Sequence, residues 1–502
     1  MPHYLSDEEL KRTAPAETAS FRSPVPTQVV SNGEYNPPPQ TREQQQVEYR
    51  IRELAEDLAP RHGLSRRRFL ASSAGMAAAF LAMNEVFGSV FDVQRAEAQT
   101  PGVADARAGA LAGQFILDDQ THFVRDDFNE KGLLGLAQYA KKHWNPALVG
   151  ENDLARFKFE NYVKEIYVDS DTKVALLSGA PFDDPNWDFL TNDQMIMART
   201  AINRIAGSRR LLAHSLFTPK KAGWLDEVDR AIAQLKPDSW KGYTVGDPLF
   251  PSTKGSYWRL DDEKLMYPFY EKIAKTDIRT ICIHKGLLPA DYEKSWPNVW
   301  QYNTVWDVGK AAKDWPQLNF VIYHGALRPF QEDPKDALAE FEQTGRMKWA
   351  TDLAEIPAKY GVNNVYGEIG TAFATCAVSN PRFAAAFMGT LIKGLGVDHV
   401  VYGSDSLWYG SPQWQIEALR RLEIPEDMRR KHGFTPLGPA DGVVKTAILG
   451  GNSARMYDVH IKAALGEIKR DHIASIKSEY VAMGGMRTNA RYGYVHRATA
   501  SV

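Results

Sequence analysis

The sequence of 502 residues contains only two cysteines, Cys282 and Cys376. At most one disulfide can therefore form within the chain. Cys282 lies in the apolar run 280–284, and Cys376 lies far downstream among small residues. Although an exported chain could pair them, these surroundings favour buried thiols, and we predict that both cysteines are free.

The chain also lacks an excess of charge of either sign. Its 60 basic and 62 acidic residues leave a net charge of −2. A nearly neutral chain has no basic bias of the kind that nucleic acids or anionic membranes attract, so we expect neither as a partner. No tandem repeat is visible. The content of hydrophobic residues, 44%, is enough for a large core, and the length suits one α/β barrel or two ordinary domains.

No apolar run is long enough to span a bilayer, which requires about 20 residues. The most suggestive run, 71–83, follows the basic motif Ser65-Arg66-Arg67-Arg68-Phe69-Leu70 and precedes the small-residue site 96–98. A basic region, an apolar region and a cleavage site in this order are typical of a secretory signal. The motif resembles the twin-arginine signal, so we predict export to the periplasm through the twin-arginine machinery and a mature chain that begins near Gln99. The alternative is an ordinary surface helix with a basic start.

The predicted signal divides the chain into four parts. Residues 1–64 are polar, contain the runs Pro37-Pro38-Pro39 and Gln44-Gln45-Gln46, and have few large apolar side chains. Such a composition predicts a disordered leader. The signal segment follows over residues 65–98, then a barrel domain over residues 99–460, argued below, and a C-terminal extension over residues 461–502.

From residue 115 onward, short β-rich runs alternate with helix-length amphipathic stretches. Eight strands with helices between them predict a (β/α)₈ barrel, a TIM-type α/β fold, with a doubly wound sheet as the alternative. The predicted strands are 115–117, 174–177, 211–213, 239–245, 280–283, 320–323, 364–366 and 399–402, and the clearest helices are 224–235, 262–274 and 382–395.

Several of these strands end in residues that can perform chemistry. In a barrel the carboxyl ends of all the strands open onto one face, so their side chains converge there. Histidines and carboxylates that meet at such a mouth can bind a metal ion. The residues at these ends are Gln120 and His122 after the first strand, His284, His324, Glu368, and Asp405 after the last strand.

The motifs that carry these residues, taken in order, resemble the amidohydrolase superfamily over residues 115–459. They are FILDDQTHF, TICIHKG, NFVIYHGA, NVYGEIG, HVVYGSDSLW and ILGGNSARMYDV. The most similar branch contains aminocarboxymuconate-semialdehyde decarboxylase and related decarboxylases. The resemblance implies one divalent metal ion, most often zinc, bound by His122, His284 and Asp405. It also implies acid/base chemistry by His324, with Asp405 orienting the reacting water.

The chain departs from the family pattern at Gln120, where the family has a histidine. An amide oxygen is a harder and weaker ligand than imidazole, so the change could favour manganese or iron over zinc. The predicted function is that of a metal-dependent hydrolase or decarboxylase for a small carboxylated or aromatic substrate, with Glu368 and Trp408 as substrate-binding candidates. The alternative is an exported barrel that binds a ligand and has lost metal chemistry. Lys241 is expected to have a structural or substrate-binding role, and a homo-oligomer is left open.

Overall fold

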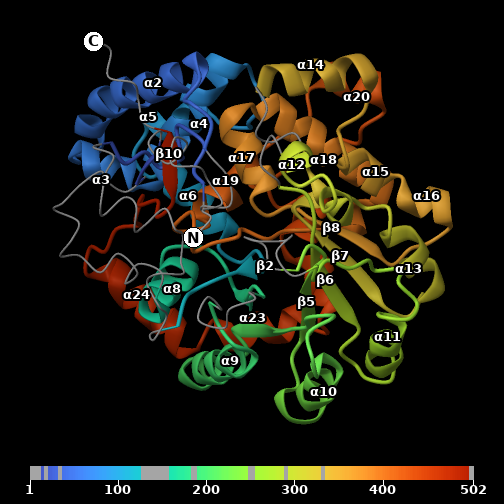
Figure 1. The fold of residues 1–502 in the computed structure, drawn as a ribbon. Helices are drawn as coiled ribbons and strands as arrows, with labels where there is room; N and C mark the ends of the chain where they lie inside the picture. Colours follow the sequence, from blue (N-terminus) through green and yellow to red (C-terminus); the bar gives the residue numbers. More distant parts are fainter. Residues whose placement is uncertain are drawn as a thin grey trace.

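The computed structural model describes residues 13–15, 21–31, 37–125, 158–181, 189–246, 255–287, 292–328 and 334–496 (Figure 1). Eight strands form one sheet in the order of the sequence, and every neighbouring pair is parallel. The strands are β2 (Leu117–Thr121), β3 (Val174–Leu177), β4 (Leu211–Leu216), β5 (Ser239–Tyr243), β6 (Thr280–His284), β7 (Asn319–Tyr323), β8 (Val365–Glu368) and β9 (Val400–Val401).

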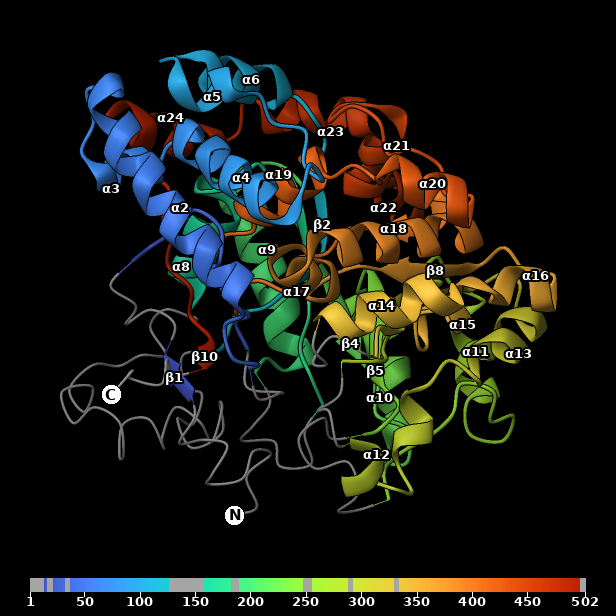
Figure 2. The ribbon, with the colours of Figure 1, turned by 90° about the horizontal axis from the view of Figure 1, so that it is seen from above.

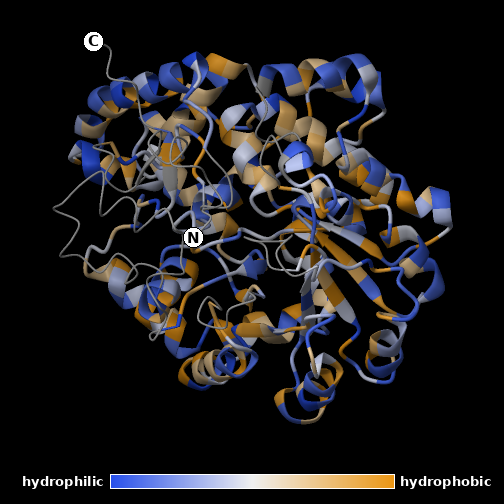
Figure 3. Cartoon of the chain, in the orientation of Figure 1, coloured by the Kyte–Doolittle hydropathy of each residue, from blue (hydrophilic) through white to orange (hydrophobic). Residues whose placement is uncertain are grey.

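The first and last strands meet and nearly close the sheet into a barrel. The amide of Asp119 donates to the carbonyl of Tyr402 at 2.9 Å, and the amide of Asp405 donates to the carbonyl of Gln120 at 2.9 Å. The predicted (β/α)₈ barrel is confirmed, and the doubly wound sheet is excluded because its strand order would reverse in the middle. In Figure 3 most of the strands other than β2 are largely hydrophobic and the outer helices carry mixed faces, as expected for strands buried on both sides.

Helices surround the barrel. The predicted helix 224–235 is present as α10 followed by a wider helical turn over 231–235, and 382–395 is present as α18. The predicted helix 262–274 begins later, at Tyr267, because Asp262 accepts the amides of residues 264 and 265 and so forms a turn. The helices are α8 (Phe159–Val163), α9 (Asn192–Ala206), α10 (Trp224–Arg230), α11 (Tyr267–Ile273), α12 (Tyr292–Ser295), α13 (Val308–Asp314), α14 (Pro334–Thr344), α15 (Ala350–Ala354), α16 (Ile356–Tyr360), α17 (Ala372–Ser379), α18 (Pro381–Leu395), α19 (Gln413–Arg421), α20 (Glu426–His432), α21 (Val443–Thr446) and α22 (Asn452–Met456).

The prediction of a disordered leader over residues 1–64 is wrong for residues 41–58. Residues Arg42–Leu58 form helix α2, whose first turn is closed by a capping box between Thr41 and Gln44. Its buried residues recur at helical spacing, at Val47, Ile51 and Ala55, and form one apolar stripe. The polar average of the segment conceals this stripe, which packs against helix α4.

The segment before the barrel continues as a layer of helices. These are α3 (Arg66–Leu70), α4 (Ser73–Phe87), α5 (Arg95–Gln99) and α6 (Val103–Leu111). In both views α4 lies beside α19 of the barrel (Figures 1 and 2). In the part of the chain that the structure describes, no helix combines the length and apolarity that crossing a bilayer requires.

The C-terminal extension packs on the barrel rather than leaving it. It contains α23 (Ile461–Ile468), α24 (His472–Ala482) and β10 (Tyr494–His496), which pairs antiparallel with β1 (Thr13–Pro15). Asp471 at the start of α24 forms a buried ion pair with Arg210 beside β4, with 2.6 Å between carboxylate and guanidinium. Cys282 and Cys376 are both buried and free, as predicted.

Candidate active site

The candidate residues lie together at the carboxyl end of the barrel. Gln120 lies on β2 and His284 is the last residue of β6, while His324 directly follows β7 and Asp405 follows β9. None of them is more than 6% exposed. The parallel strands bring side chains from four distant parts of the sequence to one buried mouth, as the sequence predicts.

His122 and Asp405 form the first pair. Nε2 of His122 lies 2.9 Å from Oδ1 of Asp405, and Nδ1 of His122 lies 2.8 Å from the carbonyl oxygen of Ser178. Since a carbonyl only accepts, Nδ1 carries a proton, and a bare Nε2 would point its lone pair at the carboxylate. A cation between the two atoms, a proton or a metal ion, removes this repulsion. Burial would raise the pKa of Asp405, but His122 and the hydroxyl of Thr371 hold it below its usual value.

His284 and His324 form the second pair. Nδ1 of His324 donates to the carbonyl of Gly370 at 2.9 Å, so its Nε2 is the acceptor for Nδ1 of His284 at 3.1 Å. The lone pair on Nε2 of His284 is therefore left for a ligand. Burial lowers the pKa of His324 to about 4 and that of His284 well below its usual value, so both rings are neutral at pH 7.

The donors are of the types that bind a divalent ion, and two of the distances between them are at or just below those of ligands around one ion. A donor held at about 2.1 Å from an ion lies roughly 3.0–3.4 Å from the next. The pair His122–Asp405 is separated by 2.9 Å, and the amide nitrogen of Gln120 lies 3.4 Å from Nε2 of His122. The buried amide oxygen of Gln120 has no hydrogen-bond partner, and a turn of the amide would exchange the two atoms. Across the described ranges, however, no three His, Cys, Asp or Glu residues surround a common point. His122, Asp405 and Gln120 are thus brought together, whereas His284 lies in the neighbouring pair.

The carboxylate of Glu368, a predicted substrate contact, accepts two backbone amides. One carboxylate oxygen accepts the amide of His324 at 3.0 Å, and the other accepts the amide of Gly370. The side chain is completely buried, and burial raises its pKa to about 8. Because Gly370 in turn accepts the ring of His324, Glu368 fixes both the backbone and the ring of that histidine.

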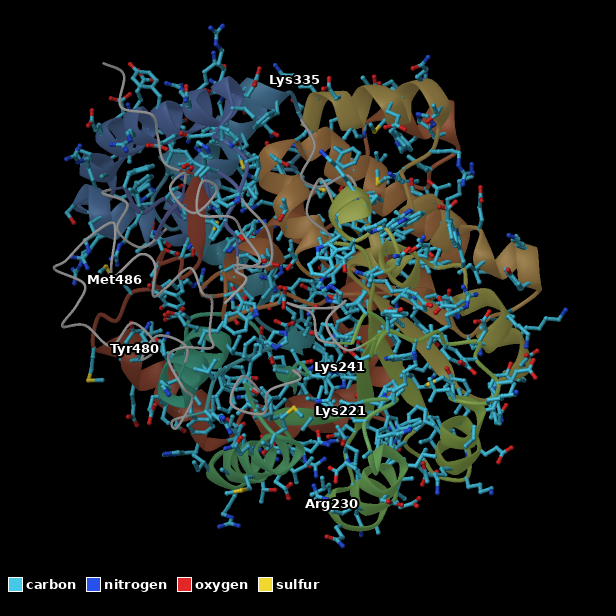
Figure 4. All side chains as sticks on the ribbon, in the orientation of Figure 1. Lys221, Arg230, Lys241, Lys335, Tyr480 and Met486 are labelled. Atoms are coloured by element: carbon cyan, nitrogen blue, oxygen red, sulfur yellow. The ribbon has the colours of Figure 1, made fainter. Side chains whose placement is uncertain are left out.

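Aromatic rings support both histidine pairs. Trp408, a predicted substrate contact, stacks on His122 with ring centroids 5.5 Å apart and is only 4% exposed. Tyr243 stacks on His284 at 4.8 Å. On β5, the ammonium group of Lys241 lies 3.3 Å from the centroid of Tyr323, inside the barrel (Figure 4). These contacts orient the imidazoles and make the walls of the site aromatic.

Sequence reasoning missed three contributors. The hydroxyl of Thr371 donates to Oδ2 of Asp405 at 2.5 Å and contacts the hydroxyl of Tyr409, and the backbone of Ser178 and Gly370 orients the two histidines. A backbone carbonyl leaves no signal in a sequence. Backbone strain does mark the site in three dimensions, since His324, Thr371 and Asp405 have φ angles of 62°, 54° and 57°.

Comparison with a model of the amidohydrolase family matches residues 198–459, slightly more than half of the chain. The match includes His284, His324 and Asp405 and begins after Gln120 and His122. No curated protein matches the chain.

Solved structures with a similar outline include an uncharacterised TIM-barrel protein from Bordetella bronchiseptica, at 12% identity and a TM-score of 0.44, covering 70% of this chain and 99% of that one. 5-Carboxyvanillate decarboxylase from Sphingomonas paucimobilis is 15% identical with a TM-score of 0.40, covering 69% and 99%. The enzyme of the same name from Novosphingobium aromaticivorans, complexed with manganese, is 14% identical with a TM-score of 0.40, covering 69% and 97%. Likeness of this degree does not bear on the substrate or the metal of this chain.

Proposed function

The chain belongs to the amidohydrolase family, and on that premise we propose that it is a metal-dependent enzyme that hydrolyses or decarboxylates a small carboxylated or aromatic substrate. One observation carries the proposal. Nε2 of His122 faces the carboxylate of Asp405 at 2.9 Å while its other ring nitrogen donates to a carbonyl, which is how metal-binding histidines are usually held.

The residues that would hold the ion are His122 and Asp405, with the amide oxygen of Gln120 and Nε2 of His284 as the remaining donors. When bound, a divalent ion supplies a Lewis acid that polarises a carbonyl or carboxylate oxygen of the substrate. A donor set of two imidazoles and two oxygens suits zinc, manganese and iron, and the amide oxygen favours the harder ions.

His324 is the acid/base group in this proposal. Its neutral Nε2, which accepts the N–H of His284 at 3.1 Å, can take a proton from the substrate or a water molecule and return it in a later step. Glu368 and the carbonyl of Gly370 keep the ring in the tautomer that this exchange needs. The pair can thus move a proton to a leaving group in hydrolysis or to a ring carbon in decarboxylation.

The substrate class is supported by the walls of the site. The rings of Trp408 and Tyr243 lie against the two imidazoles, so a planar substrate would meet aromatic surfaces beside the donors. The low exposure of these residues means that a small substrate fits the proposal better than a polymer.

The test is metal analysis of the purified full chain, followed by turnover of small carboxylated aromatic compounds. We expect about one equivalent of a divalent ion in the wild-type protein. In Asp405→Ala the affinity for this ion should fall by more than about 10–100-fold. The matched control is Asp441→Ala, an exposed aspartate, which should keep the ion. A wild-type protein that binds no divalent ion, even when one is added, would refute the proposal and leave a ligand-binding barrel.

Product analysis separates the two reactions. Release of CO₂ with a loss of one carboxyl group identifies a decarboxylase, and cleavage by water without CO₂ identifies a hydrolase. Export through the twin-arginine machinery and assembly into a homo-oligomer stay predictions from the sequence.

A further inference from the structure

The apolar run of the predicted signal is part of the hydrophobic core. It forms helix α4, in which Ala77, Ala78, Ala79 and Ala82 are completely inaccessible to solvent and Phe80 is 1% exposed. These residues belong to the same continuous cluster as the apolar residues of the barrel helices. Figure 2 shows α4 between α2 and α19 on the side of the barrel.

The predicted cleavage site is closed by buried ion pairs. Glu97, the middle residue of the small-residue site, is 5% exposed, and its carboxylate lies 2.6 Å from the guanidinium of Arg421 on α19. Arg421 also pairs with Glu417 at 3.2 Å, and Arg107 on α6 pairs with Glu417 at 2.7 Å. If residues 65–98 undocked, Glu97 would lose Arg421, whereas Arg421 and Arg107 would keep Glu417. Loss of a partner by a buried charge is destabilising.

The backbone joins the same two segments. The amide of Asp92 donates to the carbonyl of Arg421 at 2.7 Å, and the amide of Glu423 donates to the carbonyl of Val90 at 2.8 Å. Phe91 and Leu422 therefore form an antiparallel bridge between the end of α4 and the end of α19. Undocking the signal segment would break these bonds as well as the ion pairs.

The arginines of the basic motif lie on the exposed side of this layer. Arg66, on α3, has a side chain that is 66% exposed and pairs with Glu56 of α2. The folded protein therefore displays the arginines of the basic motif, while most of the apolar run is buried. At the small-residue site Glu97 and Ala98 are buried and Ala96 is exposed. Cleavage after Ala98 would require a peptidase to reach this peptide bond, which is preceded by the buried Glu97 and Ala98.

We propose that residues 65–98 are a permanent structural layer of the folded protein, fixed to α19 by the Glu97–Arg421–Glu417–Arg107 network, and that the chain is not cleaved after Ala98. The proposal is independent of the chemistry at the barrel mouth. It is incompatible with a mature chain that begins near Gln99.

The first test is the N-terminal sequence and intact mass of the full chain after expression in a bacterium that possesses the twin-arginine machinery. We expect a chain that retains residues 65–98. A folded protein that begins near Gln99 would overturn the proposal.

The second test is hydrogen exchange of the purified full chain, read by mass spectrometry. The amides of α4 and α5 should exchange as slowly as those of the barrel strands. Glu97→Gln should speed exchange across residues 73–99 by at least about tenfold, because it leaves Arg421 with one carboxylate fewer. The matched control, Glu56→Gln, removes an exposed ion pair from the same layer and should change the rates by less than about twofold.

The second test can overturn either the attachment of the layer or the role of the ion pairs. Rapid exchange in α4 of the wild-type protein, with protected barrel strands, would mean that the layer is loosely attached and would overturn the proposal. Equal rates in Glu97→Gln and Glu56→Gln would overturn the role of the ion network. If Glu97→Gln does not fold, the wild-type exchange profile and the N-terminal sequence still decide.

Discussion

Replacing Glu368 by glutamine should destabilise the protein at pH 5 and stabilise it at pH 9. At pH 5 the wild-type carboxyl is protonated and neutral, because burial raises its pKa to about 8 from the usual 4.5. The glutamine side chain has one oxygen in place of two, so one of the backbone N–H groups of His324 and Gly370 loses its acceptor. An unsatisfied buried donor costs about 1–3 kcal/mol.

At pH 9 the balance reverses. A carboxyl whose folded pKa lies above its unfolded pKa contributes stability at low pH and loses it as the pH rises toward the folded value. The difference between a folded pKa of about 8 and an unfolded pKa of 4.5 corresponds to roughly 5 kcal/mol in the free energy of unfolding, which the wild type loses by pH 9. Glutamine does not titrate, so the variant does not lose this stability. The variant should therefore be more stable by about 2–4 kcal/mol.

The assay is thermal unfolding of both proteins at pH 5, 7 and 9. For a chain of this length 1 kcal/mol corresponds to about 1 °C in Tm, so Tm of the variant should lie about 1–3 °C below wild type at pH 5 and about 2–4 °C above it at pH 9. Glu56→Gln, on the surface, should show no crossover. A difference of the same sign and size at both extremes would refute the reasoning, because Glu368 would then hold no extra proton when folded.

Three further predictions concern the site and its support. Replacing His324 by glutamine should lower the turnover rate by about 10²–10⁴-fold with metal content unchanged, measured by single-substrate kinetics and metal analysis, and loss of the ion would identify a ligand instead. Replacing Gln120 by histidine should raise zinc affinity in a chelator competition titration, and equal affinities would place residue 120 outside the ligand set. Replacing Gly410 by alanine should destabilise the protein by about 1–3 kcal/mol in denaturant titrations, since φ is 75° and the new Cβ would lie 2.2 Å from the carbonyl of Ala490. Gly113→Ala, which meets open space, is its control and should be neutral.

The barrel and most of the candidate site could be predicted from the sequence. A strand that is buried on both faces is a short apolar run in the sequence, and the polar residue at its carboxyl end lies at the active-site face of the barrel. His284 and His324 therefore mark both the end of a strand and the position of the site. These are local signals, carried by residues that are neighbours in the chain. For the same reason the predicted strand 174–177 coincides with β3.

The role of Glu368 could not be predicted in this way. A strand-end glutamate looks the same in the sequence whether it faces a substrate or caps backbone amides, and only the position of the His324 loop decides between the two. The pairing of His122 with Asp405, two residues 283 positions apart, likewise depends on closure of the barrel between its first and last strands.

The sequence by itself determined the alternation of strands and helices, the family and the residues at the strand ends, because these properties depend on composition and order along the chain. Only the tertiary structure decided where the segment before the barrel packs. The same basic motif, alanine-rich run and small-residue site is compatible with an export signal and with a buried helix. The two differ in their partners: in the folded protein the run packs in the same hydrophobic core as α19, and Glu97 pairs with the buried Arg421 of that helix. These partners lie more than 300 positions away in the sequence.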